Sequence, residues 1–187
     1  MIYFDMDGVL AQYKYIAYLG ENPIWLRKEE HYFLNIEPYE QVLDTFKKLI
    51  KIIPEDVYVY TSVYGGDIEI RNVQIHDKMM WLEKYIPEFD IGAHFIANST
   101  GRDKRDNITA IRGMSLTKRD ILIDDYNPNL FRWTMSGGKA IKCLNGINSL
   151  ETWNGDYTYV SKEVADSFED LDWESSYHDI CSLLSKK

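Results

Sequence analysis

The feature that most constrains this chain is a short β-forming run that stops abruptly at acidic side chains. Residues 2–4 favour a strand, and Asp5 and Asp7 follow at once. Gly8 then permits a tight turn, because it has no Cβ. Carboxylates this close repel each other unless a cation or a shared proton lies between them. The segment therefore indicates a strand that delivers acids to a cation site, and the plain alternative is a strand that ends in an acidic turn.

Three later β-forming runs also stop at polar side chains. They cover residues 57–60, 94–98 and 120–123. All three contain the β-branched, aromatic or other apolar residues that are typical of buried strands. The polar residues that follow them are Thr61 and Ser62, the loop Arg102-Asp103-Lys104, and the pair Asp124 and Asp125.

Helical patterns separate these runs. Pro54 and Pro87 end the first two helices, while Asn127 and Pro128 have the form of an N-cap and a first helical position. Strands that alternate with helices predict a doubly wound α/β sheet, mainly parallel, in which ligands bind outside the carboxyl ends of the strands. We therefore expect the polar residues above to meet at one edge. The expected helices cover 42–53, 67–86, 106–112 and 127–135, with a fifth strand over 140–144 and one terminal helix in the tail 156–187.

Composition narrows the class of protein and of partner. At 187 residues the chain suits a single domain, and its formal charge of −9 argues against a duplex nucleic acid partner. No run approaches the roughly 20 apolar residues that a membrane span needs. Cys143 and Cys181 cannot form a disulfide framework, which favours reduced thiols in a cytoplasmic protein. A small anionic substrate remains compatible, because a metal ion and a lysine reverse the potential locally.

Residues 12–37 interrupt the alternating pattern. Aromatic and charged side chains are interleaved there, with weak helical periodicity and a break at Asn22-Pro23, so one or two short helices are expected. A piece of this size cannot build its own core. We expect it to lie over another surface as a small cap, and the alternative is a helical excursion that packs its aromatic side chains inward.

The strand-end residues suit phosphoryl transfer. Hard oxygen ligands select Mg²⁺, and no cluster of His or Cys offers a rival site. Asp5 can attack phosphorus as a nucleophile, while Asp7 can protonate the leaving oxygen and then deprotonate water. Thr61 or Ser62 would hydrogen-bond a phosphoryl oxygen, and a lysine would neutralise the charge shared by nucleophile and phosphate.

These motifs resemble the haloacid-dehalogenase-like superfamily and, within it, the 5′(3′)-deoxyribonucleotidase (type C cytosolic nucleotidase) branch. The resemblance spans roughly residues 1–145, with the motifs in the family's order, and it implies a Rossmann-like core with an inserted cap that sets substrate choice. The matching segments are Asp5-Met6-Asp7-Gly8-Val9-Leu10-Ala11, Phe33-Leu34-Asn35-Ile36-Glu37-Pro38, Tyr60-Thr61-Ser62, Arg102-Asp103-Lys104 and Leu122-Ile123-Asp124-Asp125.

The resemblance also implies roles for individual residues. Asp5 would be the nucleophile and Asp7 the acid/base. The Asp5 carboxylate, the Asp7 main-chain carbonyl and Asp125 would hold Mg²⁺, with Asp124 behind them.

Phosphate contacts are expected from the second and third motifs. Thr61 and Lys104 would bind the phosphate, with Ser62 and Arg102 as further candidates, and Tyr13 would lie against the substrate. Lys118 is the alternative to Lys104, although it precedes a predicted strand instead of following one.

The expected activity is therefore a Mg²⁺-dependent phosphatase for nucleoside monophosphates, deoxyribonucleotides above all. Its expected partner is a small phosphomonoester. Two alternatives stay open: a sugar phosphate or another phosphomonoester as substrate, and a catalytically idle nucleotide-binding module. Dehalogenation is disfavoured, because it would leave Asp7 and the pair Asp124 and Asp125 without a task.

Overall fold

The computed structural model of the protein describes residues 1–13, 23–145, 153 and 155–159. In these residues six strands form one sheet in the order β3-β2-β1-β4-β5-β6, and every neighbouring pair is parallel. The order reverses at β1, which confirms the expected doubly wound α/β architecture. The strands are β1 (Ile2–Phe4), β2 (Val57–Val63), β3 (Phe95–Ser99), β4 (Ile121–Asp124), β5 (Lys139–Leu144) and β6 (Asp156–Tyr159).

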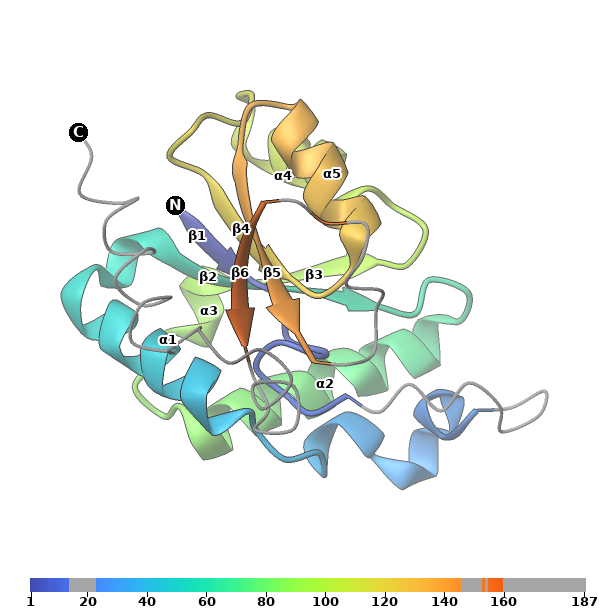
Figure 1. Ribbon diagram of the computed structural model, residues 1–187. Helices are drawn as coiled ribbons and strands as arrows, with labels where there is room; N and C mark the ends of the chain where they lie inside the picture. The colour runs from blue at the N-terminus through green and yellow to red at the C-terminus, as the bar shows by residue number, and fades with distance from the viewer. Residues whose placement is uncertain (14–22, 146–152, 154, 160–187) are drawn as a thin grey trace.

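Helices cover both faces of the sheet (Figure 1). One face carries α1 (Glu40–Ile52), α2 (Ile68–Tyr85) and the short α3 (Ile91–His94), and the other carries α4 (Lys104–Arg112) and α5 (Asn127–Met135). Single turns of 3-10 helix occupy Ile24–Leu26, Lys28–Glu30, Tyr32–Leu34 and Pro54–Asp56.

The sheet separates two hydrophobic cores. Side chains alternate along a strand, so Ile2 and Phe4 of β1 belong to the core under α1 and α2, while Tyr3 belongs to the core under α4 and α5. Both cores exclude water, as expected for a parallel sheet that is covered on both faces. The buried β1 therefore holds the residue that follows it in a fixed position.

Helix α2 is unusual because its buried surface is partly polar. Gln74, Asp77 and Lys78 are at most 4% exposed, although helices of this type normally bury apolar side chains. These three residues lie at i, i+3 and i+4 and so share one face of the helix. This face points away from solvent toward the site and toward residues 23–37.

The excursion after β1 has a closed base. The Gln12 amide donates to Glu37 O at 2.7 Å, and the Tyr39 amide donates to Leu10 O at 2.9 Å. Between these points the described residues 23–37 form three turns of 3-10 helix instead of the one or two short helices expected, and residues 14–22 lie outside the described part of the chain.

Several element boundaries differ from those predicted. Helix α4 begins at Lys104, because Asp103 accepts the Arg105 amide as its N-cap. Asn127 is not the N-cap of α5; Tyr126 is, and the Asn127 side chain instead accepts a hydrogen bond from Lys142. The short helix α3 was not predicted.

The predicted terminal helix is wrong for residues 156–159. They form β6, which pairs with β5, and the remainder of the predicted helix lies outside the described residues. Among the helices that the structure describes, none has both the length and the apolar character needed to cross a membrane.

Candidate active site

Three buried carboxylates meet where β1 and β4 end. Phe4 pairs with Ile123, and the Asp5 amide donates to Ile123 O at 2.8 Å, which places Asp5 beside the end of β4. Asp5, Asp124 and Asp125 each offer one oxygen, and these three oxygens lie within 4.8 Å of one another. The predicted meeting of carboxylates at one sheet edge is therefore present.

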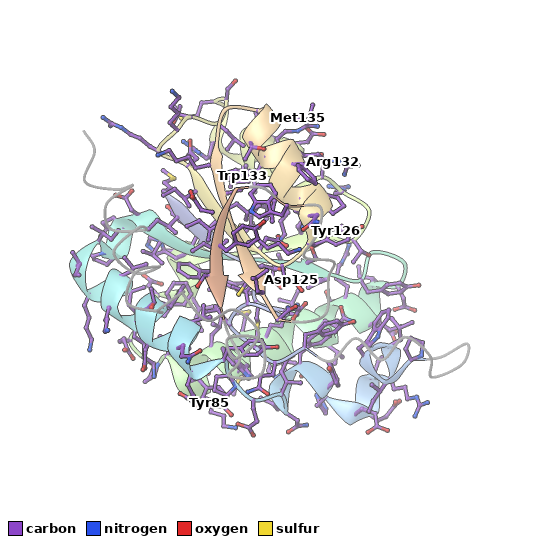
Figure 2. All side chains as sticks on the ribbon, in the orientation of Figure 1. Tyr85, Asp125, Tyr126, Arg132, Trp133 and Met135 are labelled. Atoms are coloured by element: carbon purple, nitrogen blue, oxygen red, sulfur yellow. The ribbon has the colours of Figure 1, made fainter. Side chains whose placement is uncertain are left out.

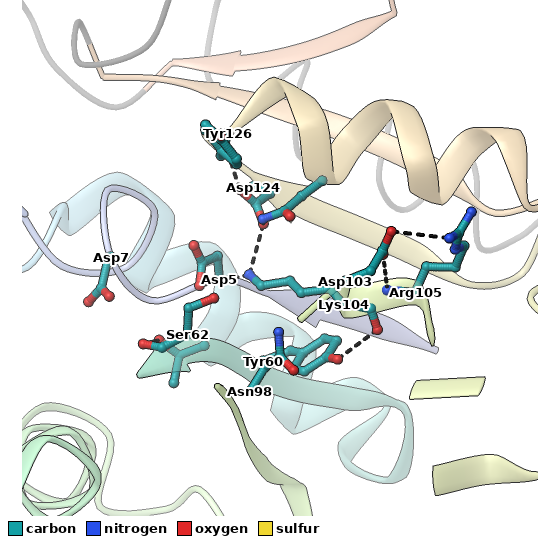
Figure 3. Close-up of polar contacts among 12 residues, drawn as sticks. Asp5, Asp7, Tyr60, Ser62, Asn98, Asp103, Lys104, Arg105, Asp124 and Tyr126 are labelled. Carbon is teal, nitrogen blue, oxygen red and sulfur yellow. Dashed lines mark hydrogen bonds and ion pairs between the residues drawn. The ribbon is translucent and has the colours of Figure 1, made fainter. Parts of the chain in front are cut away.

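Lys104 supplies the positive charge beside these carboxylates. Its Nζ lies 3.0 Å from Asp5 Oδ1 and 2.8 Å from Asp124 Oδ2, and the side chain is 1% exposed. Figure 3 shows it extending from the start of α4 toward both acids. Lys118 is exposed and precedes β4, at the opposite end of the strand. Of the two candidate lysines, Lys104 is the one that reaches the site.

The two adjacent acids after β4 have different surroundings. Asp124 is fully buried and accepts hydrogen bonds from the Tyr126 amide at 2.8 Å, from Asn129 Nδ2 at 2.9 Å and from Lys104. Asp125 accepts a hydrogen bond from Asn145 Nδ2 at 2.8 Å and lines a cavity of about 620 Å³. The geometry therefore fits Asp125 as the carboxylate that faces a ligand and Asp124 as the group that orients Lys104.

Burial of so many acids shifts their proton affinity. Desolvation raises the pKa of Asp5 to about 8, with Lys104 opposing the shift and Asp124 adding to it. Desolvation and the neighbouring Asp124 raise the pKa of Asp125 to about 7. Burial lowers the pKa of Lys104, but Asp124 and Asp5 outweigh it, so the net shift is upward and the ammonium stays charged.

The donor set fits a hard divalent cation. Asp5 Oδ1 is buried and, apart from its ion pair with Lys104, makes no hydrogen bond within the described chain, so it has a lone pair left over. Carboxylate oxygens are the ligands that Mg²⁺ prefers, and a divalent ion would offset the repulsion among Asp5, Asp124 and Asp125.

A second lysine, which the sequence did not single out, lies against Asp7. Lys78 Nζ donates to Asp7 Oδ2 at 2.5 Å, to Thr61 Oγ1 at 2.7 Å and to the Ser62 carbonyl at 2.9 Å. In the sequence it resembles any lysine on the polar face of a helix. The available signal was the weak amphipathicity of α2, whose polar residues do not all fit on one exposed face.

The carboxylates open into a cavity of about 620 Å³. Aromatic side chains form much of its wall, and Trp25 and Tyr64 meet edge to face with ring centroids 6.4 Å apart. Tyr13 and Phe33 stack with centroids 6.4 Å apart. The lining residues are Asp5, Asp7, Tyr13, Trp25, Phe33, Ser62, Val63, Tyr64, Gln74, Thr100, Asp125, Tyr126 and Asn129.

Most of the predicted site residues lie in or beside this cavity. Thr61 is buried next to Asp7 through their shared contact with Lys78. Arg102 is the exception, because it is exposed and lines a separate hollow with Arg105 and Arg132. Figure 2 shows Arg132 well along α5, away from Asp125. The structure therefore does not bring Arg102 to the carboxylates.

Comparison with known proteins gives a fold but no close relative. No family model and no curated protein matches the sequence. Twelve chains of solved structures match the fold. One is a haloacid dehalogenase-like family hydrolase from Streptococcus pneumoniae, with a TM-score of 0.53 and 12% identity over 90% of this chain and 97% of that chain. The protein therefore has the fold of a haloacid dehalogenase-like hydrolase.

Proposed function

We propose that this protein is a Mg²⁺-dependent phosphatase that hydrolyses nucleoside monophosphates, with deoxyribonucleotides as the preferred class. The observation that carries the proposal is the group of three buried carboxylates beside Lys104, at the mouth of an aromatic cavity. Its fold, like that of a solved hydrolase, supports the same reaction class. A cytoplasmic location and a small phosphomonoester as the partner, with neither duplex nucleic acid nor a membrane, belong to the same proposal.

The metal would be held by the Asp5 carboxylate, the Asp7 main-chain carbonyl and Asp125. When bound, Mg²⁺ supplies charge neutralisation and polarises the phosphoryl group. Asp124 keeps its three hydrogen bonds and orients Lys104 instead of binding the metal.

Asp5 and Asp7 divide the chemistry between them. The Asp5 carboxylate attacks phosphorus and the ester P–O bond breaks, while Asp7 gives a proton to the departing oxygen. This leaves phosphate covalently on Asp5 and frees the nucleoside. Water then attacks the same phosphorus and gives its proton to Asp7, so that inorganic phosphate leaves and both carboxyl groups return to their starting states.

The remaining polar groups stabilise the transferred phosphoryl group. Lys104 lies close enough to Asp5 to neutralise charge shared by the nucleophile and the phosphorus, and Thr61 and Ser62 can donate hydroxyl protons to phosphoryl oxygens. Arg102 has no part in this proposal, because its exposed side chain lies outside the cavity.

The aromatic wall supports a nucleoside as the leaving group. A cavity of about 620 Å³ falls in the size range of sites for small ligands. Planar bases gain roughly 1–3 kcal/mol by stacking on an aromatic side chain. Tyr13, Trp25 and Phe33 all belong to the segment 12–37. We assign this segment the role of a cap that selects the substrate.

A phosphate-release assay tests the function directly. Deoxyribonucleotides, ribonucleotides and sugar phosphates would each be supplied with Mg²⁺ and with a chelator. The expected result is Mg²⁺-dependent release that is fastest from deoxyribonucleoside monophosphates. Equal rates on sugar phosphates would remove the nucleotide assignment, and tight nucleotide binding without release would identify a binding module instead.

A further inference from the structure

Lys78 is a buried cation whose hydrogen-bonding capacity is fully matched. An ammonium has three protons to donate, and Lys78 Nζ has three acceptors within 2.9 Å: Asp7 Oδ2, Thr61 Oγ1 and Ser62 O. The side chain is 0% exposed. A charge at such a place is stable only when its partners are well arranged, so the contacts of Lys78 fix the positions of the groups around it.

The contact with Asp7 makes its two carboxylate oxygens different. Oδ2 is held by Lys78 at 2.5 Å, while Oδ1 is buried and has no hydrogen-bond partner among the described residues. The Asp7 side chain is 19% exposed and lines the cavity. One oxygen therefore anchors the carboxyl group, and the other keeps its lone pairs without a hydrogen bond in the described part of the chain.

The contact with Thr61 sets the direction of its hydroxyl proton. An ammonium can only donate, so Thr61 Oγ1 must accept from Lys78 and is left with its own proton to give. Among the described residues, the Thr61 hydroxyl donates to Ser62 O at 3.5 Å, which is too long for a strong bond. The Thr61 hydroxyl proton therefore has no strong acceptor among the described residues.

Lys78 also touches the segment that forms the aromatic wall. Its Nζ lies 4.4 Å from the centroid of the Phe33 ring, which lines the cavity. Two neighbours on the same helix hold the same segment: Gln74 Nε2 donates to Trp25 O at 2.8 Å, and Trp81 Nε1 donates to Ile36 O at 2.7 Å. Helix α2 thus fixes the position of the Lys78 ammonium relative to both Asp7 and the Phe33 ring.

We propose that Lys78 is a positioning residue for the reaction, which holds Asp7 with one oxygen toward the leaving group and directs the Thr61 hydroxyl toward the phosphoryl group. This inference rests on the proposed phosphatase function. Lys78 acts on the side of Asp7, whereas Lys104 acts on the side of Asp5 and Asp124.

The test compares two substrates whose leaving groups differ in how strongly they need a proton. A nucleoside alkoxide needs a proton from Asp7, whereas 4-nitrophenolate leaves readily without one. General acid catalysis is typically worth 10²–10⁴-fold, so Lys78→Met should lower kcat/KM by about 100-fold on a nucleoside monophosphate and by less than about 10-fold on 4-nitrophenyl phosphate. Lys84→Met, on the exposed surface of the same helix, is the matched control and should leave both values unchanged.

A double variant separates positioning from a purely structural role. If Lys78 acts through Asp7, then Asp7→Asn combined with Lys78→Met should lose no more than about 3-fold beyond Asp7→Asn alone, because coupled residues are non-additive. Equal losses on both substrates, or losses that multiply in the double variant, would overturn the proposal. The double variant leaves no buried unpaired charge, so it serves even if Lys78→Met fails to fold.

A measurement that does not depend on turnover tests the contact between Lys78 and Asp7 directly. In protein labelled with ¹⁵N-lysine, the signal of the Lys78 ammonium is assigned by its loss in the double variant. It should shift in Asp7→Asn and stay in place in Lys84→Met, and an unshifted signal in Asp7→Asn contradicts the inference. If the wild-type protein releases no phosphate, the proposed function fails, and this spectrum alone decides whether Lys78 holds Asp7.

Discussion

A Cβ atom placed on Gly8 would lie 2.5 Å from Oδ2 of Asp125. The backbone of the turn after Asp5 therefore packs against the carboxylate of Asp125, which follows β4. Gly8 also has φ of +78°, a conformation that favours glycine. This close packing fixes the position of the turn that contains Asp5 and Asp7 relative to Asp125.

Gly8→Ala should be much worse than an alanine at a comparable glycine. Gly113 has φ of +66°, and a Cβ added there would meet no atom within 4 Å, so Gly113→Ala should cost only the backbone strain, about 1 kcal/mol. Gly8→Ala adds the clash with Asp125 and Asn145, and we expect a clearly larger loss of unfolding free energy and weaker Mg²⁺ binding. Urea unfolding and Mg²⁺ titration measure both, and equal costs for the two variants would contradict the close packing.

Asp5→Asn should abolish turnover and preserve the fold. The amide cannot attack phosphorus, but it has the size of the carboxyl group and removes a charge whose burial raises the pKa to about 8. In chelator at pH 8 the variant should therefore melt no lower than the wild-type protein. Asp106→Asn, at an exposed carboxylate, should retain activity. Measurable turnover in Asp5→Asn would exclude the covalent mechanism.

The metal-free protein should become less stable as the pH rises. Asp5 and Asp125 have pKa values of about 8 and about 7 in the folded state, against an ordinary value of 3.8, so the folded state binds more protons than the unfolded state across this window. This contribution to stability is complete below about pH 4 and is lost as the pH rises through 7 and 8.

Mg²⁺ competes with these protons for the carboxylates. The rise in Tm that Mg²⁺ produces should therefore be larger at pH 8 than at pH 6. Thermal unfolding in chelator and in MgCl₂ from pH 5.5 to 8.5 measures it. A Mg²⁺ effect that does not change with pH would argue against these carboxylates as the site, and Asp5→Asn should weaken the pH dependence.

Trp25→Ala should weaken binding of the nucleoside without slowing the chemical step. Loss of one stacking partner is worth roughly 1–3 kcal/mol, so KM for a nucleoside monophosphate should rise about 10-fold with little change in kcat. A substrate without a base, such as ribose 5-phosphate, provides the comparison, because its KM should hardly change. Equal increases for both substrates would show that Trp25 supports the fold of the cavity and does not contact a base.

The carboxylate cluster was predictable from the sequence because its members follow strands. Asp5 and Asp124 each stand at the end of a short apolar run, and parallel strands place such residues at one edge whatever their separation along the chain. The choice of Lys104 over Lys118 followed from the same rule, since only Lys104 comes after a strand.

The features that escaped prediction depend on contacts between distant segments. Lys78 lies inside a helix, where spacing alone cannot tell a buried lysine from an exposed one, and its partners Asp7 and Thr61 come from two other elements. Strand β6 forms because β5 offers it a parallel edge, which an acidic tail does not reveal. Asn127 had the form of an N-cap, but its tertiary contact with Lys142 prevailed over the local preference.

The closed base of the excursion between Ala11 and Pro38 has a consequence for redesigning this protein. The Gln12 amide donates a hydrogen bond to Glu37 O, so the two ends of the excursion stay together whatever sequence lies between them. Lengthening such a loop adds only slowly to the entropy of closing it. Insertions, deletions or whole replacements there can reshape the aromatic wall without moving Asp5 or Asp7, which makes this junction a natural site for grafting new caps.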